Sequence, residues 1–320
     1  MVIRINDFEY SHSKENLFEV KFDALKRPVP ESFYKYYSLS ENSVNAITTP
    51  CVYASHPNQL NDPFDCCKDI IKVDDQETLL CLIGDSYDSL YNMLSEREFD
   101  DFVSKALSTL MYRKYGIFSM TSNPYNELMW SHYSQKSGFC VELEMNKFTF
   151  KHYGPFPVNY VDTLPQISTS EVGLKLAANI QCNVKRLAWS YENEWRLIIP
   201  NPEGLDMKSF GDKPFCYNCG FEHDRRFRYS IEAIKRIILR KDFINHDDIV
   251  DQYEGCIIVK MNEDDTNKMD LMNLKIKLLD FIINNDIPTS ILFPNGSTGY
   301  DSIEVCIQKG SNCMYRIAEI

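Results

Sequence analysis

The stretch WSYENEWRLIIP, Trp189 to Pro200, combines an apolar run with two glutamates and an arginine. Successive side chains of a β-strand point to opposite faces of a sheet, so the pattern predicts a strand over residues 191–200 with one packed face and one charged face. On the packed face lie Tyr191, Asn193, Trp195, Leu197 and Ile199. On the other face lie Glu192, Glu194, Arg196 and Ile198.

The composition is that of a globular protein without a membrane span. The chain has 320 residues, of which 44% are hydrophobic and 25% charged, enough for one large domain or two small ones. No apolar run reaches the length of a membrane helix, and the first residues lack the pattern of a secretory signal. The eleven cysteines follow no regular spacing, which indicates reduced thiols and predicts a cytoplasmic location.

The order of predicted elements indicates the fold class. Helices are predicted over 40–47, 76–115, 125–135, 169–187 and 271–286. Strands are predicted over 33–39, 51–55, 117–122, 138–145, 155–161, 191–200, 233–240, 289–293 and 302–308. Because these elements do not alternate strictly, we expect an α+β protein with a single mixed, mainly antiparallel sheet and helices packed around it. Residues 1–30 read as a polar N-terminal extension and 31–320 as one domain, in which 261–320 either completes the sheet or forms a C-terminal subdomain.

The charge of the chain restricts its partners. The net charge of −12 disfavours non-specific binding to nucleic acid, which depends on neutralising phosphates. Seven basic residues between Arg225 and Lys241 depart from this trend, and they either meet a phosphate-rich ligand or lie on solvated strand faces.

Several common catalytic motifs are absent from the sequence. It contains no phosphate-binding glycine loop, no dinucleotide fingerprint, no His-Glu-x-x-His and no Gly-x-Ser-x-Gly. Cys216 and Cys219, followed by His223, have the spacing of half a zinc site, but no second pair completes a tetrahedral site. We therefore expect no bound metal.

Four segments carry the candidate site residues. The candidates are Tyr34 and Tyr36; Ser55, Asn61 and Asp62; His132; and Tyr191, Glu192, Glu194 and Arg196. Each residue type also has a structural explanation: tyrosines fill strands, an Asn-Asp-Pro turn caps a helix, histidine packs through hydrogen bonds, and Glu and Arg form ion pairs.

Glu142 and Glu144 repeat the Glu-x-Glu spacing and serve as an internal comparison. In CVELEM the apolar residues form the packed face, so these two glutamates are expected on the solvent side of an edge strand. Glu192 and Glu194 differ because they lie among Trp189, Tyr191 and Trp195 and beside an arginine. A carboxylate in such surroundings should experience both desolvation and a nearby cation, which is typical of functional sites.

The segments FYKYYSL, VYASHPNQLNDPFD, MWSHYSQKSGFCVEL and KRLAWSYENEWRLI occur in an order that resembles a widespread prokaryotic family known only as a domain of unknown function (number twenty-nine seventy-one). The resemblance covers roughly residues 33 to 260. It includes the Tyr-Lys-Tyr, Asn-Asp-Pro-Phe-Asp, Met-Trp-x-His-Tyr and Tyr-Glu-x-Glu-Trp-Arg motifs. Tyr37 stands where the family pattern has arginine.

The same order is also similar to that of ADP-ribosyltransferases, in which strands line a cleft that binds NAD. This resemblance implies that Tyr36 holds the adenosine ribose or phosphates and that Ser55 braces the site. Glu194 would contact the nicotinamide ribose and Glu192 would orient the acceptor. A carboxylate there stabilises the oxocarbenium-like state formed when the nicotinamide bond breaks.

Three functions therefore remain open. The first is an NAD-consuming transferase or glycohydrolase, acting as a toxin or phage-defence effector, with a nucleotide substrate and a protein or nucleic-acid acceptor. The second is a metal-dependent nuclease that uses Asp62, Asp65, His132 and the glutamates. The third is a noncatalytic sensor or interaction module, in which the aromatic residues form a binding surface and the charges are structural.

Overall fold

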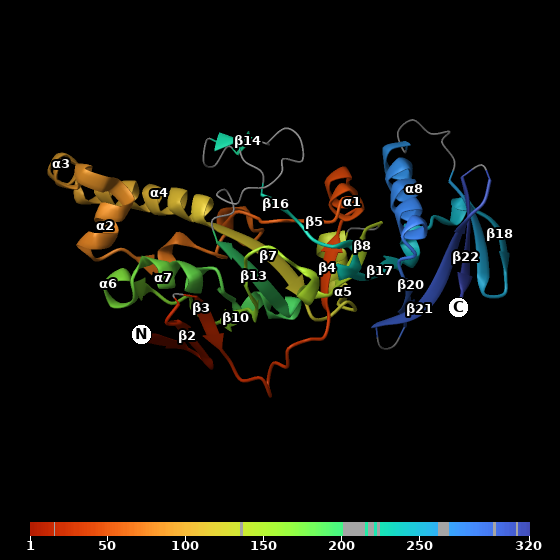
Figure 1. Ribbon diagram of the computed structural model, residues 1–320, viewed down its shortest axis with the longest axis horizontal. Helices are drawn as coiled ribbons and strands as arrows, with labels where there is room; N and C mark the ends of the chain where they lie inside the picture. The colour runs from red at the N-terminus through yellow and green to blue at the C-terminus, as the bar shows by residue number, and fades with distance from the viewer. Residues whose placement is uncertain are drawn as a thin grey trace. The chain divides into compact units, whose positions relative to one another are not determined.

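The computed structural model describes most residues of the chain. They are all residues except 16, 135–136, 201–214, 217–220, 223–224, 262–268, 297–298 and 312. The chain forms two compact units, each assembled from three segments (Figure 1). Unit 1 consists of Met1–Val29, Tyr53–Ser119 and Lys151–Phe227, and unit 2 of Pro30–Val52, Met120–Phe150 and Arg228–Ile320.

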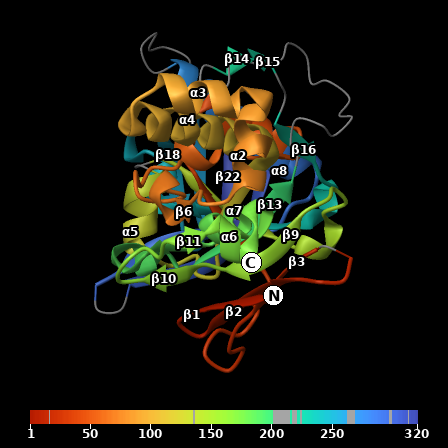
Figure 2. The same cartoon turned by 90° about the vertical axis from the view of Figure 1, so that its left-hand side faces the viewer.

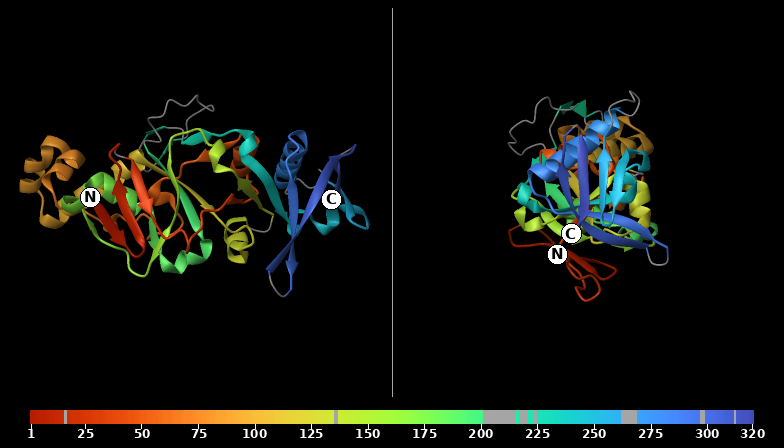
Figure 3. Two further views of the ribbon diagram at one scale, coloured as in Figure 1. Left: turned by 60° about the horizontal axis from the view of Figure 1, so that its bottom comes forward. Right: turned by 90° about the vertical axis from the view of Figure 1, so that its right-hand side faces the viewer.

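Unit 2 is built on a mixed, mainly antiparallel sheet. Its elements are β4 (Phe33–Tyr37), α1 (Glu41–Thr48), α5 (Glu127–Met129), β8 (Phe139–Leu143), β17 (Ile234–Arg240), β18 (Ile249–Tyr253), β19 (Cys256–Lys260), α8 (Met269–Asn284), β20 (Thr289–Asn295), β21 (Gly299–Lys309) and β22 (Met314–Glu319). The strands follow the order β18, β19, β22, β21, β20, β17, β8, β4, and of these neighbours only β17 and β20 run parallel. Helix α8 packs on α1 and on β21 (Figure 3). The α+β class and the mixed, mainly antiparallel sheet predicted from the sequence are confirmed.

Unit 1 combines small sheets and strand pairs with most of the described helices. Its elements are β1 (Val2–Ile5), β2 (Phe8–His12), β3 (Phe18–Lys21), β6 (Ile71–Lys72), α2 (Gln76–Ile83), α3 (Tyr87–Met93), α4 (Glu96–Lys114), β9 (Tyr153–Pro157), β10 (Asn159–Val161), β11 (Ile167–Ser168), α6 (Thr169–Val172), α7 (Leu174–Gln181), β12 (Val184–Arg186), β13 (Glu194–Pro200), β14 (Phe215–Cys216) and β15 (Phe221–Glu222). Three further strands cross the boundary along the chain: β5 (Cys51–Tyr53), β7 (Tyr115–Thr121) and β16 (Arg226–Arg228).

The core of unit 1 includes the N-terminal residues. Strands β1, β2 and β3 form an antiparallel sheet (Figure 2), and Phe8, Tyr10 and Phe18 are buried in the same cluster as Leu107 and Ile198. The segment that reads as a polar extension is thus an integral part of this core, because its alternate residues are large aromatics that pack inward.

The strand predicted over residues 191–200 is present in the structure, but it begins later than predicted. Strand β13 begins at Glu194, whereas Leu187–Glu192 is a 3-10 helix that ends at Asn193 in the left-handed conformation, with φ 44°. Asparagine tolerates this conformation because its short side chain bonds locally. The predicted division into a packed and a charged face is therefore wrong: the first six residues of β13 are all buried, on both faces of the sheet.

Glycine and capping residues divide two of the predicted helices. The helix over 76–115 is three helices, interrupted at Gly84 with φ 63° and restarted by the capping box of Ser95 and Glu98. The helix over 169–187 is interrupted at Gly173, with φ 77°, and α7 then ends at Gln181, before β12. None of the described helices combines the length and apolar character that a membrane crossing requires.

Candidate functional site

Five charged residues of unit 1 form a buried cluster. Asp65 lies in the turn that follows Asp62, Lys185 on β12, Glu192 at the end of the 3-10 helix, and Glu194 and Arg196 on β13. We call Asp65, Lys185, Glu192, Glu194 and Arg196 the charge cluster. Each is at most 5% exposed to solvent. Buried charges need partners, and these five provide them for one another.

Lys185 joins the three carboxylates of the charge cluster. Its Nζ donates to Glu192 Oε2 and, over 3.0 Å, to Glu194 Oε2, and it lies 3.5 Å from Asp65 Oδ2. An ammonium group has three donor hydrogens and no acceptor, so one lysine can serve all three carboxylates. Lysine suits position 185 because its ammonium group is a compact charge on a flexible side chain.

Arg196 binds two of these carboxylates through its fork of donors. Its Nε and one terminal nitrogen donate to Glu194 over 2.8 and 3.0 Å, and both terminal nitrogens donate to Asp65. The remaining hydrogen goes to the carbonyl oxygen of Cys182 at 3.0 Å. All five donors of the guanidinium are therefore engaged, which lysine could not reproduce.

The charge cluster carries an excess of negative charge. Three carboxylates face two cations, which leaves a formal charge of −1. Burial by itself would raise the pKa of Glu194, but Arg196 and Lys185 outweigh burial and hold this pKa far below its usual value. Burial would lower the pKa of Lys185, but Glu194 and the other carboxylates raise it. Both groups are thus ionised at neutral pH.

The surrounding backbone fixes the carboxylates in place. The Glu194 backbone N–H donates to the Tyr160 hydroxyl at 2.9 Å, and the Gln181 amide donates to the carbonyls of Cys66 and Cys67. Asp62 closes the turn by accepting from Phe64 N at 2.9 Å. Its second oxygen is buried without a hydrogen-bond partner in the described part of the chain.

Aromatic side chains border the charge cluster toward solvent. The half-buried Trp189 ring lies 4.9 Å from Lys185 Nζ, and the centroid of the half-buried Tyr191 ring is 6.0 Å from that of Trp189. The Arg186 guanidinium stacks 4.3 Å from the Phe64 ring, which is 45% exposed. We call Phe64, Arg186, Trp189 and Tyr191 the aromatic rim. Cations over aromatic faces are attracted by the ring quadrupole.

The remaining predicted site residues have other surroundings. In unit 2, Tyr36 is buried, donates its hydroxyl to Asn123 O at 2.9 Å and packs edge-on against Trp130. Tyr34 is half-buried and burial raises its pKa to about 12, while His132 is exposed on a π-helical turn.

In unit 1, Ser55 is half-buried and pairs through its backbone with Ile117, and Asn61 is exposed. Of the predicted residues, the structure brings Glu192, Glu194 and Arg196 together, with Tyr191 beside them.

Lys185 is not among the site residues predicted from the sequence, and Asp65 enters that prediction only in the metal-dependent nuclease hypothesis. A signal for Lys185 exists in the sequence: it stands between Val184 and Arg186, close to a segment with more carboxylates than cations. Buried carboxylates in excess require a further cation, so a lysine in such a position was the natural partner to seek.

The predicted edge position of Glu142 is wrong. Strand β8 lies between β4 and β17, and the Glu142 side chain is 13% exposed, 3.7 Å from Lys235 Nζ and 3.5 Å from Arg236 Nε. Glu142 thus meets cations as Glu192 and Glu194 do, but only Glu192 and Glu194 have partners that are completely enclosed.

The basic segment near Arg225 does not form one solvated surface. Arg225 is 1% exposed, and its guanidinium donates to the carbonyl oxygens of Ala54, Ser55, Tyr112 and Tyr115. It ties two parts of unit 1 together through their backbone.

The sequence pattern that resembles half a zinc site lies largely outside the described residues, which include Cys216 but neither Cys219 nor His223. Among the side chains that are described, no three His, Cys, Asp or Glu groups are arranged to hold a metal ion.

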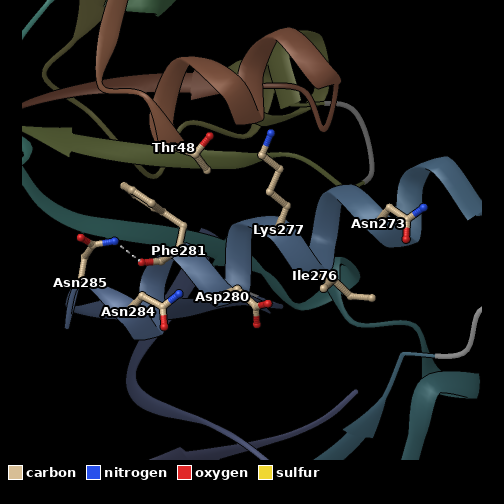
Figure 4. Close-up of a pocket in the computed structure, with 8 residues that line it drawn as sticks. All are labelled: Thr48, Asn273, Ile276, Lys277, Asp280, Phe281, Asn284 and Asn285. Atoms are coloured by element: carbon tan, nitrogen blue, oxygen red, sulfur yellow. Dashed lines mark hydrogen bonds between the residues drawn. The ribbon is translucent and has the colours of Figure 1, made fainter. Parts of the chain in front are cut away.

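Unit 2 contains a pocket of about 450 Å³ beside α8 (Figure 4). Lys277, Asp280 and Phe281 line it, with Thr48 at the end of α1. Asp280 accepts from Lys309 and Tyr315, and Lys277 donates to Asn45. None of the predicted site residues lines this pocket.

Two of the four sequence motifs that suggested a family fall within one matched segment. Residues 129–197 match the family described as a protein of unknown function, DUF2971. The DUF2971 segment contains Lys185, Glu192, Glu194 and Arg196, whereas Asp65 lies outside it. The resemblance to this family is thus confirmed over residues 129–197. No curated protein and no solved structure matches the chain.

Proposed function

We propose that this protein consumes NAD, breaking the bond between nicotinamide and ribose and passing ADP-ribose to water or to an acceptor. The observation that carries the proposal is the excess negative charge of the charge cluster directly beside the aromatic rim. Such a combination suits a ligand that is both aromatic and cationic.

The nicotinamide group of NAD is such a ligand, since its pyridinium ring carries a positive charge. Tyr191 and Trp189 offer ring faces on which the nicotinamide ring can stack, and Glu192 is the residue that follows Tyr191 in the sequence. Arg186, held over Phe64, is available for a phosphate of the nucleotide, because a guanidinium binds phosphate oxygens in pairs. The substrate is therefore expected to lie along the rim.

The bond-breaking step fits an ionised Glu194. When the C–N bond breaks, its electron pair leaves with nicotinamide, which becomes neutral, and the positive charge moves to the ribose. A fixed carboxylate stabilises this oxocarbenium-like state, and removing one such contact typically lowers the rate by about a hundredfold to a thousandfold. Water or an acceptor hydroxyl then bonds to the ribose carbon and loses its proton. Consumption of NAD would suit a toxin or phage-defence effector.

The test is nicotinamide release from NAD by the purified full chain, followed by chromatography. Tyr191→Ala changes the half-buried rim and should raise KM with the protein still folded, while Glu194→Gln should abolish kcat. Glu142→Gln is the matched control, because Glu142 is also a paired, largely buried carboxylate on a strand. Thermal melting of each variant separates a catalytic loss from unfolding.

The outcomes separate the proposed NAD-consuming function from the metal-dependent alternative. Release by the native chain and by Glu142→Gln, but not by folded Glu194→Gln, supports the proposal. Absence of release from the native chain with every acceptor class overturns it. Nuclease activity abolished by EDTA would instead indicate the metal-dependent alternative.

A further inference from the structure

Residues 74–102 of unit 1 form a helical arm that is barely buried. This helical arm comprises α2, α3 and the first turns of α4, coloured orange in Figures 1 and 2. Helix α3 buries none of its seven residues, and among the described residues of α2 only Thr78 is buried. By contrast, the later part of α4 places Leu107 and Met111 in the core of unit 1. The helical arm is thus anchored at one end and largely solvated.

Large apolar side chains are exposed on the helical arm. Tyr91 is 60% and Met93 80% exposed, and Leu80 and Phe102 are 43% and 39% exposed. The Tyr91 ring contacts Phe99 edge-on at 5.3 Å, and Phe102 lies one helical turn beyond Phe99. Tyr91, Phe99 and Phe102 are therefore grouped rather than scattered singly, and exposed apolar groups of this kind mark interaction surfaces.

The helical arm also holds most of the net charge of the protein. Residues 74–102 contain nine aspartates and glutamates and one arginine, so nine minus one gives −8 of the total −12. A surface that is both apolar and acidic repels phosphates, anionic lipids and further copies of this acidic chain. It attracts a partner that presents lysine or arginine around an apolar face.

We propose that the helical arm is the docking surface for a basic, amphipathic helix of a partner protein. Amphipathic helices bind by laying their apolar face on exposed apolar side chains, while the flanking charges select the partner. Tyr91 and Phe102, on either side of Phe99, are the apolar anchors, and Asp88, Asp100 and Asp101 supply the charge. This surface is independent of the charge cluster and goes beyond the proposed NAD chemistry.

The experiment measures binding of a fluorescent leucine–lysine peptide of about 18 residues, patterned with all leucines on one helical face, by anisotropy with the full chain. Two variants remove the surface: Tyr91→Ser with Phe102→Ser, and Asp88→Asn with Asp100→Asn and Asp101→Asn. Each should weaken binding about tenfold or more, since a few central anchors carry most interface energy. A peptide of the same composition in scrambled order should bind at least about tenfold more weakly than the patterned one.

Matched control variants lie on β18 of unit 2 and in the residues directly flanking it. Val250→Ser with Tyr253→Ser removes two side chains that are 53% and 47% exposed, and Asp247→Asn, Asp251→Asn and Glu254→Gln remove the same charge elsewhere. Both controls should retain the native affinity. Equal affinity of the native and arm variants overturns the proposal, as does equal binding of the scrambled peptide, which would reduce the effect to charge attraction. Self-association that the arm variants abolish would assign the surface to a second copy and also overturn it.

Discussion

Two pairs of glutamates with the same spacing lie in different settings. Glu192 and Glu194 share Lys185 within the charge cluster, and every member is at most 5% exposed. Glu142 lies beside Lys235 and Arg236, whose side chains are 42% and 34% exposed, and Glu144 bonds Asn146 on the surface. The contrast teaches that Glu-x-Glu spacing does not determine the role; the enclosure of the cationic partner does.

Enclosure changes what each ion pair does to stability. An exposed pair exchanges hydration for a contact of similar strength and contributes about 0 to 1 kcal/mol. A buried network replaces hydration entirely, so removing one member leaves a charge with neither water nor partner. The comparison therefore predicts large effects in one region and small effects in the other.

The largest effect is expected for Arg196→Met. The substitution leaves the three buried carboxylates Asp65, Glu192 and Glu194 with Lys185 as the single cation of the charge cluster, and it should lower the free energy of unfolding by about 3 to 5 kcal/mol. Urea denaturation followed by circular dichroism measures the change. Arg236→Met is the control, and it should change stability by less than about 1 kcal/mol because Arg236 is partly solvated. Equal losses in both variants would contradict the distinction between the two regions.

Glu194→Gln should have a smaller but clear effect. The amide keeps the shape of the side chain, yet it weakens bonds to both Arg196 and Lys185, so we expect a loss of about 1 to 3 kcal/mol. Glu142→Gln should lose less than about 1 kcal/mol. Chemical denaturation of both variants under identical conditions compares them directly. A greater loss for Glu142→Gln would mean that burial does not decide the strength of these pairs.

The sequence predicted the elements better than their contacts. The helix predicted over 271–286 is α8, Met269–Asn284, because its apolar residues recur at helical spacing over a long stretch. The 3-10 helix before β13 was missed, since Tyr191 and Trp195 favour strands locally while the left-handed Asn193 depends on the fold around it. Glu194 and Arg196 could be identified as a pair from their spacing. Asp65 could not be joined to them, because it lies 131 residues from Arg196 in the chain.

The pH dependence of stability tests the ionised state of Glu194. Because its folded pKa is depressed, its contribution is present above the unfolded pKa of roughly 4.3 and is lost as the pH falls through the folded value. The native chain should therefore lose stability steadily below about pH 4, and Glu194→Gln should lose less over the same interval. Urea midpoints between neutral and acidic pH measure both slopes. Parallel curves would show that Glu194 does not titrate with folding.

The smallest effect within the charge cluster is expected for Glu192→Gln. Arg196 binds Asp65 and Glu194 but not Glu192, so Glu192 is the carboxylate in excess of the two cations. When Glu192 is neutral, Lys185 still has Glu194 as a partner at 3.0 Å. The substitution should therefore change the free energy of unfolding by less than about 1 kcal/mol, since a neutral amide in place of an excess buried charge relieves repulsion. If the excess charge serves the proposed cationic substrate, the same variant should raise KM for NAD with stability unchanged. A stability loss as large as that of Glu194→Gln would show instead that all three carboxylates are structural.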